Sequence, residues 1–410
     1  MKKALVCSVG VGSGIERPIL LSIEIYSPEI VVLAGTVASR EKIEEVCAKC
    51  DEIEVVKSFF SNPDDLTKCY KESLKILEEL KERGYNYKDI YLNITSGTKV
   101  MSAALSLAAV SRGCGSFCYV AGERDENGRV ISGTERTLTL KPTTIFAERM
   151  LSEAKSYFDR YLYGACEVLC SEVRGLTEEK EIVEKAEFIN KINRGYFLWD
   201  VFNHKEAFEE LKRAAGLSTK KRKKILEKNI NFLNKCVKER ETEARVGKHL
   251  ILDLYANALR RGEEGKYDDA VARLYRCLEM LGQWLLWREF GLLHYDVDID
   301  SGLFNEEQRR VLKGWKGREK KLSVGLKKCW LILGMLKREL GKNPIREKGL
   351  EAILSVRNNS ILAHGSEPVG KEVFEKFERK MREELKREME DFDSLFKLTE
   401  HFKFEKEGGG

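Results

Sequence analysis

Two residues in the C-terminal part of the chain, Arg357 and His364, have the types and the spacing for acid–base chemistry on a phosphate. They lie in a segment with a helical pattern of apolar residues. Seven residues make almost two helical turns, so both side chains fall on one face, roughly 10 Å apart along the axis. An arginine stays charged and suits a phosphate, whereas a histidine titrates near neutrality and can move a proton. The pair therefore fits cleavage of RNA.

The same pair also has a purely structural interpretation. The residues that follow Arg357, namely Asn358, Asn359 and Ser360, are mediocre helix formers. An arginine and a histidine on one helix face are more often a solvated ion pair or a hydrogen-bonded core histidine. Spacing alone does not decide between the two interpretations.

The first 142 residues alternate between short apolar runs and helical patterns. Strands are predicted at residues 4–9, 30–34, 53–56 and 89–94. Helices are predicted between and after them, at residues 15–25, 39–50, 63–84 and 100–111. This alternation indicates a parallel sheet with right-handed crossovers, a Rossmann-like α/β layout. Beyond residue 142 the strand signals stop, and amphipathic helices are predicted at residues 145–173, 178–193 and 204–215.

Two loops that follow predicted strands carry the residue types of a phosphate site. One runs from Gly10 to Gly14 after the first strand, and the other runs from Asn93 to Lys99 after the fourth. Glycine lets the backbone approach a ligand, and the helix that follows presents free N–H groups to an anion. Loops at the carboxyl ends of parallel strands meet where the strand order switches, so one binding site is predicted there. Its candidate residues are Gly12, Ser13, Gly14, Thr36, Ser39, Asn93, Thr95, Ser96, Gly97, Thr98 and Lys99.

Neither loop matches a common nucleotide fingerprint. The first lacks the glycine spacing of the dinucleotide motif, and no acidic residue follows the second strand to bind a ribose. The second lacks the spacing of a P-loop, so ATP hydrolysis is not expected. Both loops also fit ordinary strand-to-helix turns with a capped helix.

Three blocks of the sequence resemble one known family. Arg357-Asn358, a five-residue spacer and His364 resemble the motif of HEPN ribonucleases, and residues 252–262 and 266–276 resemble the opening helices of that domain. The loop at residues 93–99 is similar to the second signature loop of CARF domains, which sense cyclic oligoadenylates. The family is the CARF–HEPN ribonucleases of type III CRISPR systems, of the Csm6/Csx1-like group. The resemblance implies a CARF-like sensor at residues 1–142, an all-α connector at 143–240, an all-α HEPN bundle at 241–400 and a tail at 401–410.

The resemblance also implies an activity. The protein would be an endoribonuclease of antiviral defence that cyclic oligoadenylate activates, with cyclic tetra-adenylate favoured over cyclic hexa-adenylate. A homodimer would bind the ring across its two-fold axis and would join two copies of the motif in one cleft. Arg357 would neutralise the phosphate, His364 would carry the proton and Asn358 would position either group. The nucleophile would be the 2′-hydroxyl of a single-stranded RNA, so neither a metal nor a cofactor is expected, and DNA is not an expected partner.

Two other classes of function stay open at this point. One is a cyclic-oligoadenylate-responsive regulator, in which the C-terminal helical bundle only dimerises. The sequence has no readable helix-turn-helix or winged pattern that would favour this alternative. The other is a nucleotide-dependent metabolic enzyme with its catalytic site in the α/β part, where neither paired carboxylates nor a nucleophile elbow can be found.

The composition constrains the partners and the location. Charged residues make up 34% of the chain and its only glutamines are Gln283 and Gln308, which is typical of a thermophile protein. The net charge is only +5, so nucleic acid must be bound by local patches such as residues 220–224, a run that also fits an ordinary solvated helix face. No apolar stretch is long enough to span a membrane, and the first residues lead into a strand, so a cytoplasmic protein is expected.

The eleven cysteines do not indicate a metal site. Cys47 and Cys50 form a single CxxC without a second pair nearby, and the chain has five histidines in all. The other close pairs are interpreted as small buried apolar residues: Cys114 with Cys118, and Cys166 with Cys170. Structural zinc is therefore not expected.

Overall fold

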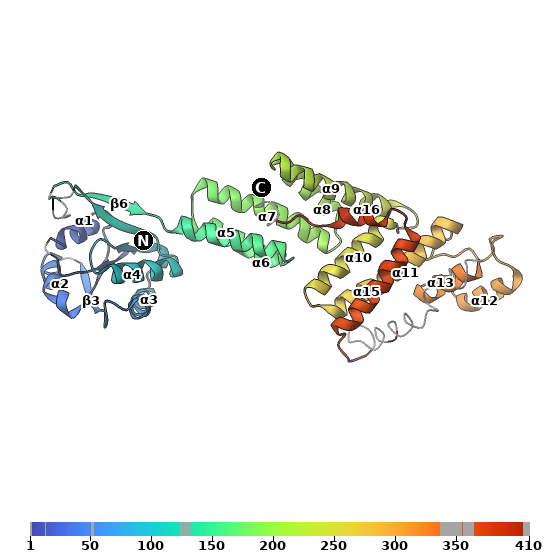
Figure 1. Cartoon of the computed structure of the whole chain (residues 1–410), viewed down its shortest axis with the longest axis horizontal. Coiled ribbons are helices and arrows are strands. Elements are labelled where there is room, and N and C mark those ends of the chain that lie inside the picture. Colours follow the sequence, from blue (N-terminus) through green and yellow to red (C-terminus); the bar gives the residue numbers. More distant parts are fainter. Residues whose placement is uncertain are drawn as a thin grey trace. The chain divides into compact units, whose positions relative to one another are not determined.

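The computed structural model describes residues 2–12, 14–50, 53–123, 133–336 and 365–404, together with residues 126, 131 and 355. The chain divides into two compact units. Unit 1 comprises Met1–Ser152 and Leu169–Ala186, and unit 2 comprises Glu153–Val168 and Glu187–Gly410. Figure 1 shows the elements of each unit. The boundaries predicted for a sensor, a connector and a nuclease domain differ from this division and stay predictions.

Unit 1 is built around a six-stranded sheet with the order β3-β2-β1-β4-β5-β6. Its strands are β1 (Ala4–Ser8), β2 (Ile30–Gly35), β3 (Glu54–Phe59), β4 (Ile90–Asn93), β5 (Ser116–Ala121) and β6 (Arg136–Leu140). The pairs among β1 to β5 are parallel, and β6 is antiparallel to β5. The Rossmann-like sheet and its first four strands are thus confirmed. The sequence interpretation missed β5 and the edge strand β6.

Helices cover both faces of this sheet, which explains why β1 and β2 are buried at every position. On one face the apolar side chains of α1 (Glu16–Tyr26) and α2 (Arg40–Cys47) pack against alternate residues of the strands. On the other face α3 (Leu66–Glu82) and α4 (Lys99–Arg112) do the same (Figure 1). The sheet is therefore the middle layer of three, and ligands can reach it only at its edges.

The helices that follow the sheet are α5 (Thr143–Asp159), α6 (Tyr163–Leu176), α7 (Lys180–Asp200), α8 (His204–Gly216) and α9 (Lys220–Glu241). The single helix predicted at residues 145–173 is wrong, because it breaks at Tyr161. This residue has a φ of 64°, in the left-handed region. Its N–H donates to the carbonyl of Phe158, and the N–H of Leu162 donates to the carbonyl of Tyr157. These two bonds form a Schellman motif, which ends α5 with tyrosine where glycine is usual.

Further helices complete unit 2, namely α10 (Lys248–Glu263), α11 (Tyr267–Phe290), α12 (Glu306–Lys316), α13 (Leu326–Met335), α15 (Lys371–Glu388) and α16 (Phe392–Phe396). α11 is the central helix of this group, because it contacts α10, α13 and α15 (Figure 1). Past β6 the described residues contain no strand and only isolated bridge positions, such as the pair Leu293 and Asp296. The predicted all-α character of this part is confirmed for the residues that the structure describes.

A buried carboxylate joins α10 to α7 and α8. Asp253 is fully buried, accepts a hydrogen bond from Trp199 Nε1 at 2.7 Å and lies 2.6 Å from His204 Nε2. The other ring nitrogen of His204 accepts from Arg240 Nε at 2.9 Å, so Nε2 carries the proton and donates to Asp253. Helices assigned by the sequence to a connector and to a HEPN bundle therefore share one core.

The last described residues belong to the core of unit 2. The side chains of His401, Phe402 and Phe404 are buried. The ring of Phe158 contacts both phenylalanines, and that of Trp199 lies 4.5 Å from that of His401. The tail predicted at residues 401–410 is therefore wrong for residues 401–404, because their aromatic rings fill space between helices.

Hydrogen bonds hold the same segment. Asn229 in α9 donates to the carbonyls of Leu398 and Glu400, both at 2.9 Å. Tyr163 hydroxyl bonds to His401 Nδ1 at 2.7 Å. Burial, together with nearby cations such as Arg260, lowers the pKa of His401 well below its usual value, so the ring is neutral in the folded protein.

We predict that a chain ending at Glu400 is much less stable than a chain ending at Phe404. The shorter chain lacks two buried phenylalanine rings, and loss of one such ring costs about 3–5 kcal/mol. Urea unfolding followed by tryptophan fluorescence measures the difference, because Trp199 lies in this cluster. Equal midpoints for the two truncated chains would show that residues 401–404 do not support the core.

Candidate functional site

The loops after β1 and β4 lie together at the carboxyl edge of the sheet. β1 pairs with β2 on one side and with β4 on the other, so the strand order reverses between them. This is the position at which open α/β sheets bind ligands. The two backbones approach closely, since a Cβ atom on Gly10 would lie 3.0 Å from the backbone N of Gly97. Glycine is therefore required where the loops meet.

Ser8, the last residue of β1, ties the two loops together. Its hydroxyl donates to the carbonyl of Ser96, and the hydroxyl of Ser96 donates back to the carbonyl of Ser8. Ser102 in α4 donates to the same carbonyl of Ser96 at 3.0 Å. The sequence interpretation missed Ser8. The available signal was a polar residue in an otherwise apolar strand, two residues before the first glycine of the loop.

Asn93 holds the second loop from inside the protein. Its side chain is fully buried, and Nδ2 donates to Ser22 Oγ at 2.7 Å and to the carbonyl of Pro18 at 2.9 Å, both in α1. Its Oδ1 accepts from the N–H of Thr95 at 2.9 Å. The side-chain amide is therefore used within the protein, and Asn93 shapes the loop.

Several of the predicted hydroxyl groups are also bonded within the protein. Thr95 Oγ1 accepts from the N–H of Val120 at 3.0 Å, and Thr98 Oγ1 accepts from the N–H of Met101 at 3.1 Å as the N-cap of α4. The buried Ser39 bonds to both backbone groups of Thr36. These contacts are the ones that a strand-to-helix turn needs. They fix the shape of the edge to which a ligand would bind.

Backbone N–H groups and one lysine are left for an anion. Gly97 has a φ of 91°, and the N–H groups of Ser96, Gly97 and Thr98 make no hydrogen bond with any described residue. They lead into the N-terminus of α4, whose free N–H groups and dipole favour negative charge. Lys99 is exposed and has no ion pair within the described part of the chain. This arrangement can bind a phosphate.

The loop after β1 faces solvent beside these groups. Gly12 and Gly14 are exposed, and Gly14 has a φ of 75°, which favours glycine. Ser13 lies outside the described residues. Val11 is 65% exposed on the same loop, and Val37 is 73% exposed after β2. The edge therefore combines backbone donors with two uncovered apolar side chains.

The candidate catalytic residues Arg357, Asn358 and His364 lie outside the described residues, as does Ser360. The helices on either side of them in the sequence are described, because α13 ends at Met335 and α15 begins at Lys371. α15 packs on α10 where a Cβ atom on Gly262 would lie 2.3 Å from the ring of Phe374. The segments that flank the motif in the sequence thus belong to the helical core of unit 2.

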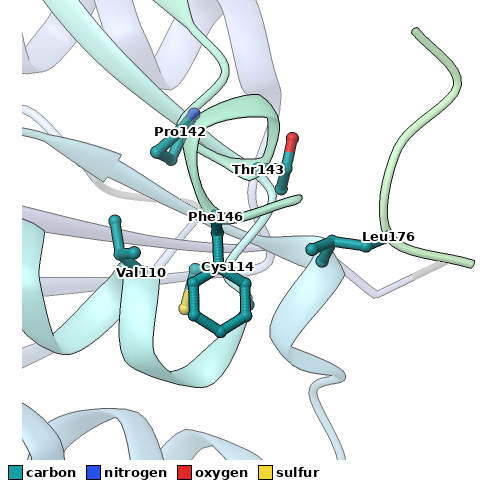
Figure 2. Close-up of a pocket in the computed structure, with 7 residues that line it drawn as sticks. Val110, Cys114, Pro142, Thr143, Phe146 and Leu176 are labelled. Atoms are coloured by element: carbon teal, nitrogen blue, oxygen red, sulfur yellow. The ribbon is translucent and has the colours of Figure 1, made fainter. Parts of the chain in front are cut away.

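A small hollow lies in unit 1 at the opposite end of the strands from these loops (Figure 2). Three of its walls belong to the end of α4, the start of α5 and the end of α6. The residues that line it are Val110, Gly113, Cys114, Pro142, Thr143, Phe146 and Leu176. The ring of Phe146 fills it and leaves no room for water. Burial raises the pKa of Cys114 to about 12, so its thiol is neutral. This hollow is a packing contact that fastens α5 and α6 to the sheet.

Metal ligands and membrane spans were also sought. Among the described residues, no three histidine, cysteine or acidic side chains are grouped as a metal site requires. Cys114, Cys118, Cys166 and Cys170 are buried, as interpreted from the sequence, and none of them forms a disulfide with a described residue. None of the helices that the structure describes is both long and apolar enough to cross a membrane.

Comparison with known proteins assigns the C-terminal part. Residues 239–388 match the model of the Csm6 HEPN domain, and this stretch contains α10 to α13, α15 and the Arg357–His364 motif. The solved structure of Enterococcus italicus Csm6 bound to cyclic hexa-2′-fluoro-hexa-dAMP is similar over 97% of this chain and 98% of that chain, with a TM-score of 0.63 and 14% identity. The chain as a whole therefore has the fold of this Csm6 structure. More particularly, residues 239–388 are similar to the Csm6 HEPN domain.

Two other solved structures match part of the chain. A type III CRISPR defence DNA nuclease activated by cyclic oligoadenylate matches 47% of this chain and 34% of that chain, with 17% identity and a TM-score of 0.26. Can2 from Sulfobacillus thermosulfidooxidans in complex with cyclic tetra-adenylate matches 50% and 68%, with 13% identity and a TM-score of 0.24. These scores are too low to support an argument. A search among curated protein sequences found no match.

We predict that Gly97→Ala destabilises unit 1 more than Gly84→Ala. Both glycines have nearly the same φ, 91° and 90°, so both substitutions meet the left-handed penalty of about 1–2 kcal/mol. At Gly97 the new Cβ atom would also lie 3.1 Å from Ser8 Cβ, whereas nothing lies within 4 Å at Gly84. This crowding should lower the free energy of unfolding of the Gly97→Ala protein by about a further 1–3 kcal/mol. Urea unfolding measures the free energy of unfolding of both variants. Equal losses in the two variants would mean that the two loops separate easily.

Proposed function

We propose that this protein is an endoribonuclease that cyclic oligoadenylate activates, and that it acts in type III CRISPR defence. The observation that carries the proposal is the match of residues 239–388 to the Csm6 HEPN domain, because this stretch contains Arg357 and His364. The likeness in fold to Csm6 bound to a cyclic hexanucleotide supports the sensor half. The backbone N–H groups and the lysine at the carboxyl edge of unit 1 fit the phosphates of such a ligand.

The activator binds at the carboxyl edge of unit 1. Its phosphates meet the N–H groups of residues 96–98, the N-terminus of α4 and the Lys99 ammonium, while the loop from Gly10 to Gly14 lies beside the ring. A cyclic oligonucleotide has repeated nucleotides, so the same loops of two protomers can bind it symmetrically. The protein therefore works as a homodimer. The sequence favoured cyclic tetra-adenylate, and the Csm6 structure holds a ring of six nucleotides. Both rings are therefore used in the tests below.

The cleavage step uses only the RNA and the motif of the protein. The 2′-oxygen of the RNA attacks the adjacent phosphorus, and the 5′-oxygen of the next nucleotide leaves with a proton. The products are a 2′,3′-cyclic phosphate and a 5′-hydroxyl. Arg357 stabilises the charge on the phosphate oxygens, His364 transfers a proton and Asn358 positions one of the two. Two copies of the motif form the cleft of the dimer.

The helices α5, α6 and α7 transmit the signal in this proposal. Each of them has residues in both units, since the division falls at residues 152, 168 and 186. An activator can change activity only if it binds one conformation better than another. Residues such as Phe146 and Cys114 pack together where α5 and α6 meet the C-terminal end of α4. A change at the N-terminus of α4 would therefore reach these helices along the length of α4.

We predict that His364→Ala abolishes RNA cleavage and leaves activator binding within a few-fold. Arg357→Lys should also be severely impaired, because an ammonium does not reproduce the planar fork that a guanidinium presents to a phosphate. Cleavage of a labelled single-stranded RNA is measured in EDTA, with each activator ring in turn. Full activity of the purified His364→Ala protein would remove this histidine from the mechanism, and loss of wild-type activity in EDTA would contradict metal independence.

A further prediction concerns Lys99, with Lys88 as its control. Both lysines are exposed, but Lys88 precedes β4 at the opposite end of the strand. Lys99→Ala should weaken activator binding by about 1.5–3 kcal/mol, the range for a hydrogen bond to a charged group, and Lys88→Ala should not change it. Calorimetry with cyclic tetra-adenylate and cyclic hexa-adenylate measures both. The same affinity in both variants would move the ligand away from the α4 N-terminus.

A further inference from the structure

Five lysines of α9 form a stripe that the proposed function does not use. Lys220, Lys224, Lys228, Lys235 and Lys238 follow one another at intervals of four, four, seven and three residues. At 100° per residue these positions fall within about 80° around the helix axis, along roughly 27 Å of helix. Lys220 and Lys224, the two ends of the charged run that stood out in the sequence, are the first two residues of this lysine stripe. Figure 1 shows α9 beside α8 in unit 2.

The other side of α9 is fixed in the core, so the lysine stripe faces solvent. Leu226, Phe232 and Cys236 are buried, and Asn229 is bonded to the chain at Leu398 and Glu400. All five lysines of the stripe are exposed. Rotation of the helix would expose the apolar side chains, so the orientation of the stripe is set by packing.

The lysine stripe lacks the ion pairs that other surface helices have. In α15, Lys371, Lys376 and Lys380 each lie within 4.0 Å of a glutamate three or four residues away. None of the five lysines of the stripe has such a partner among the described residues, and Glu227 on the same helix pairs with none of them. Lysines four residues apart instead repel each other, at about 0.2–0.5 kcal/mol per pair. A polyanion lying along the helix would relieve this repulsion.

We propose that the lysine stripe binds the phosphate backbone of single-stranded RNA and so holds the substrate of the proposed nuclease. This inference rests on the proposed function. A regular row of charge over such a length fits a chain of phosphates, and the absence of an aromatic side chain within the stripe makes the binding independent of base sequence. A helix that binds a membrane surface needs an exposed apolar face, and that face of α9 is buried.

The position of α9 connects this surface to the cleavage motif. α9 packs against α10, which is the first helix within the matched HEPN stretch. RNA held on the lysine stripe is therefore bound to the same unit that carries Arg357 and His364. The stripe raises the local concentration of long substrates and takes no part in the chemical step. RNA that is too short to lie along the helix gains nothing from it.

Binding is tested with two triple variants of the full chain, both made in the His364→Ala background to prevent cleavage. The first, Lys224→Gln/Lys228→Gln/Lys235→Gln, removes three charges from the stripe. The control, Lys75→Gln/Lys376→Gln/Lys380→Gln, removes three charges that are paired with glutamates. Fluorescence anisotropy with a labelled 30-nucleotide uridine RNA is measured over a range of salt. The salt slope is the slope of log binding constant against log salt concentration, and each lost phosphate contact lowers its magnitude by about 0.7. The magnitude of the slope should therefore fall by about 2 in the first variant and stay unchanged in the control.

Cleavage is then compared with His364 intact and the activator present. The stripe variant should show a KM at least tenfold higher for the 30-nucleotide RNA, with kcat unchanged, and normal cleavage of a tetranucleotide. An unchanged salt slope overturns the proposal, and so does an equal loss in both triple variants. Retained RNA binding with lost binding to polyglutamate also overturns it, because the surface would then serve acidic proteins. If the unmodified protein cleaves no RNA, the proposed nuclease fails, and the anisotropy result still decides the RNA-binding surface.

Discussion

The contact between the backbones at Gly10 and Gly97 is the constraint on which the edge of unit 1 depends. β1 lies between β2 and β4, so the chain leaves β1 and β4 toward opposite faces of the sheet, and their loops can meet only above this boundary. The absence of side chains at both glycines allows the meeting, and Ser8 holds it by exchanging hydrogen bonds with Ser96. The N–H groups of residues 96–98, before α4, make no hydrogen bond with a described residue, and the fixed loop holds them at this edge. The strand order thus brings the two loops of the candidate anion site together, and side chains such as Ser8 then hold them in place.

In unit 2 a row of buried polar side chains on α10 has a comparable role. Asp253, Asn257 and Arg260 are spaced by four and three residues, so they share one face of α10. All three are buried: Asp253 bonds to Trp199 and His204, and the other two bond to Asp200. The polar residues that make the block from residue 252 similar to HEPN helices therefore bind α10 to α7 and α8. Replacing one partner would leave a charge buried without compensation.

The fold could be predicted from the sequence where one residue type determines the local structure. Runs of apolar residues gave the first four strands, and glycine with hydroxyl residues marked the edge at which their loops gather. β6 was missed because it is an exposed edge strand without an apolar run, and the break at Tyr161 was missed because its left-handed position has no glycine. The roles of Asn93 and Thr95 could not be predicted for another reason. Their partners Ser22 and Val120 lie 71 and 25 residues away, and only the folded chain brings them together.

The buried end of the described chain has a consequence for biosynthesis. Unit 1 draws its last residues from Leu169–Ala186, so it can close as soon as this segment has left the ribosome. The core of unit 2 is filled by Phe402 and Phe404, which are made after all of its helices. At about 5–20 residues per second, residues 187–404 take on the order of 10–40 s to synthesise. During this interval each new chain has a folded N-terminal unit, while the part that carries the HEPN motif still lacks the residues that complete its core. A nuclease built in this order would be inactive throughout its own translation, when the messenger RNA is nearest to it.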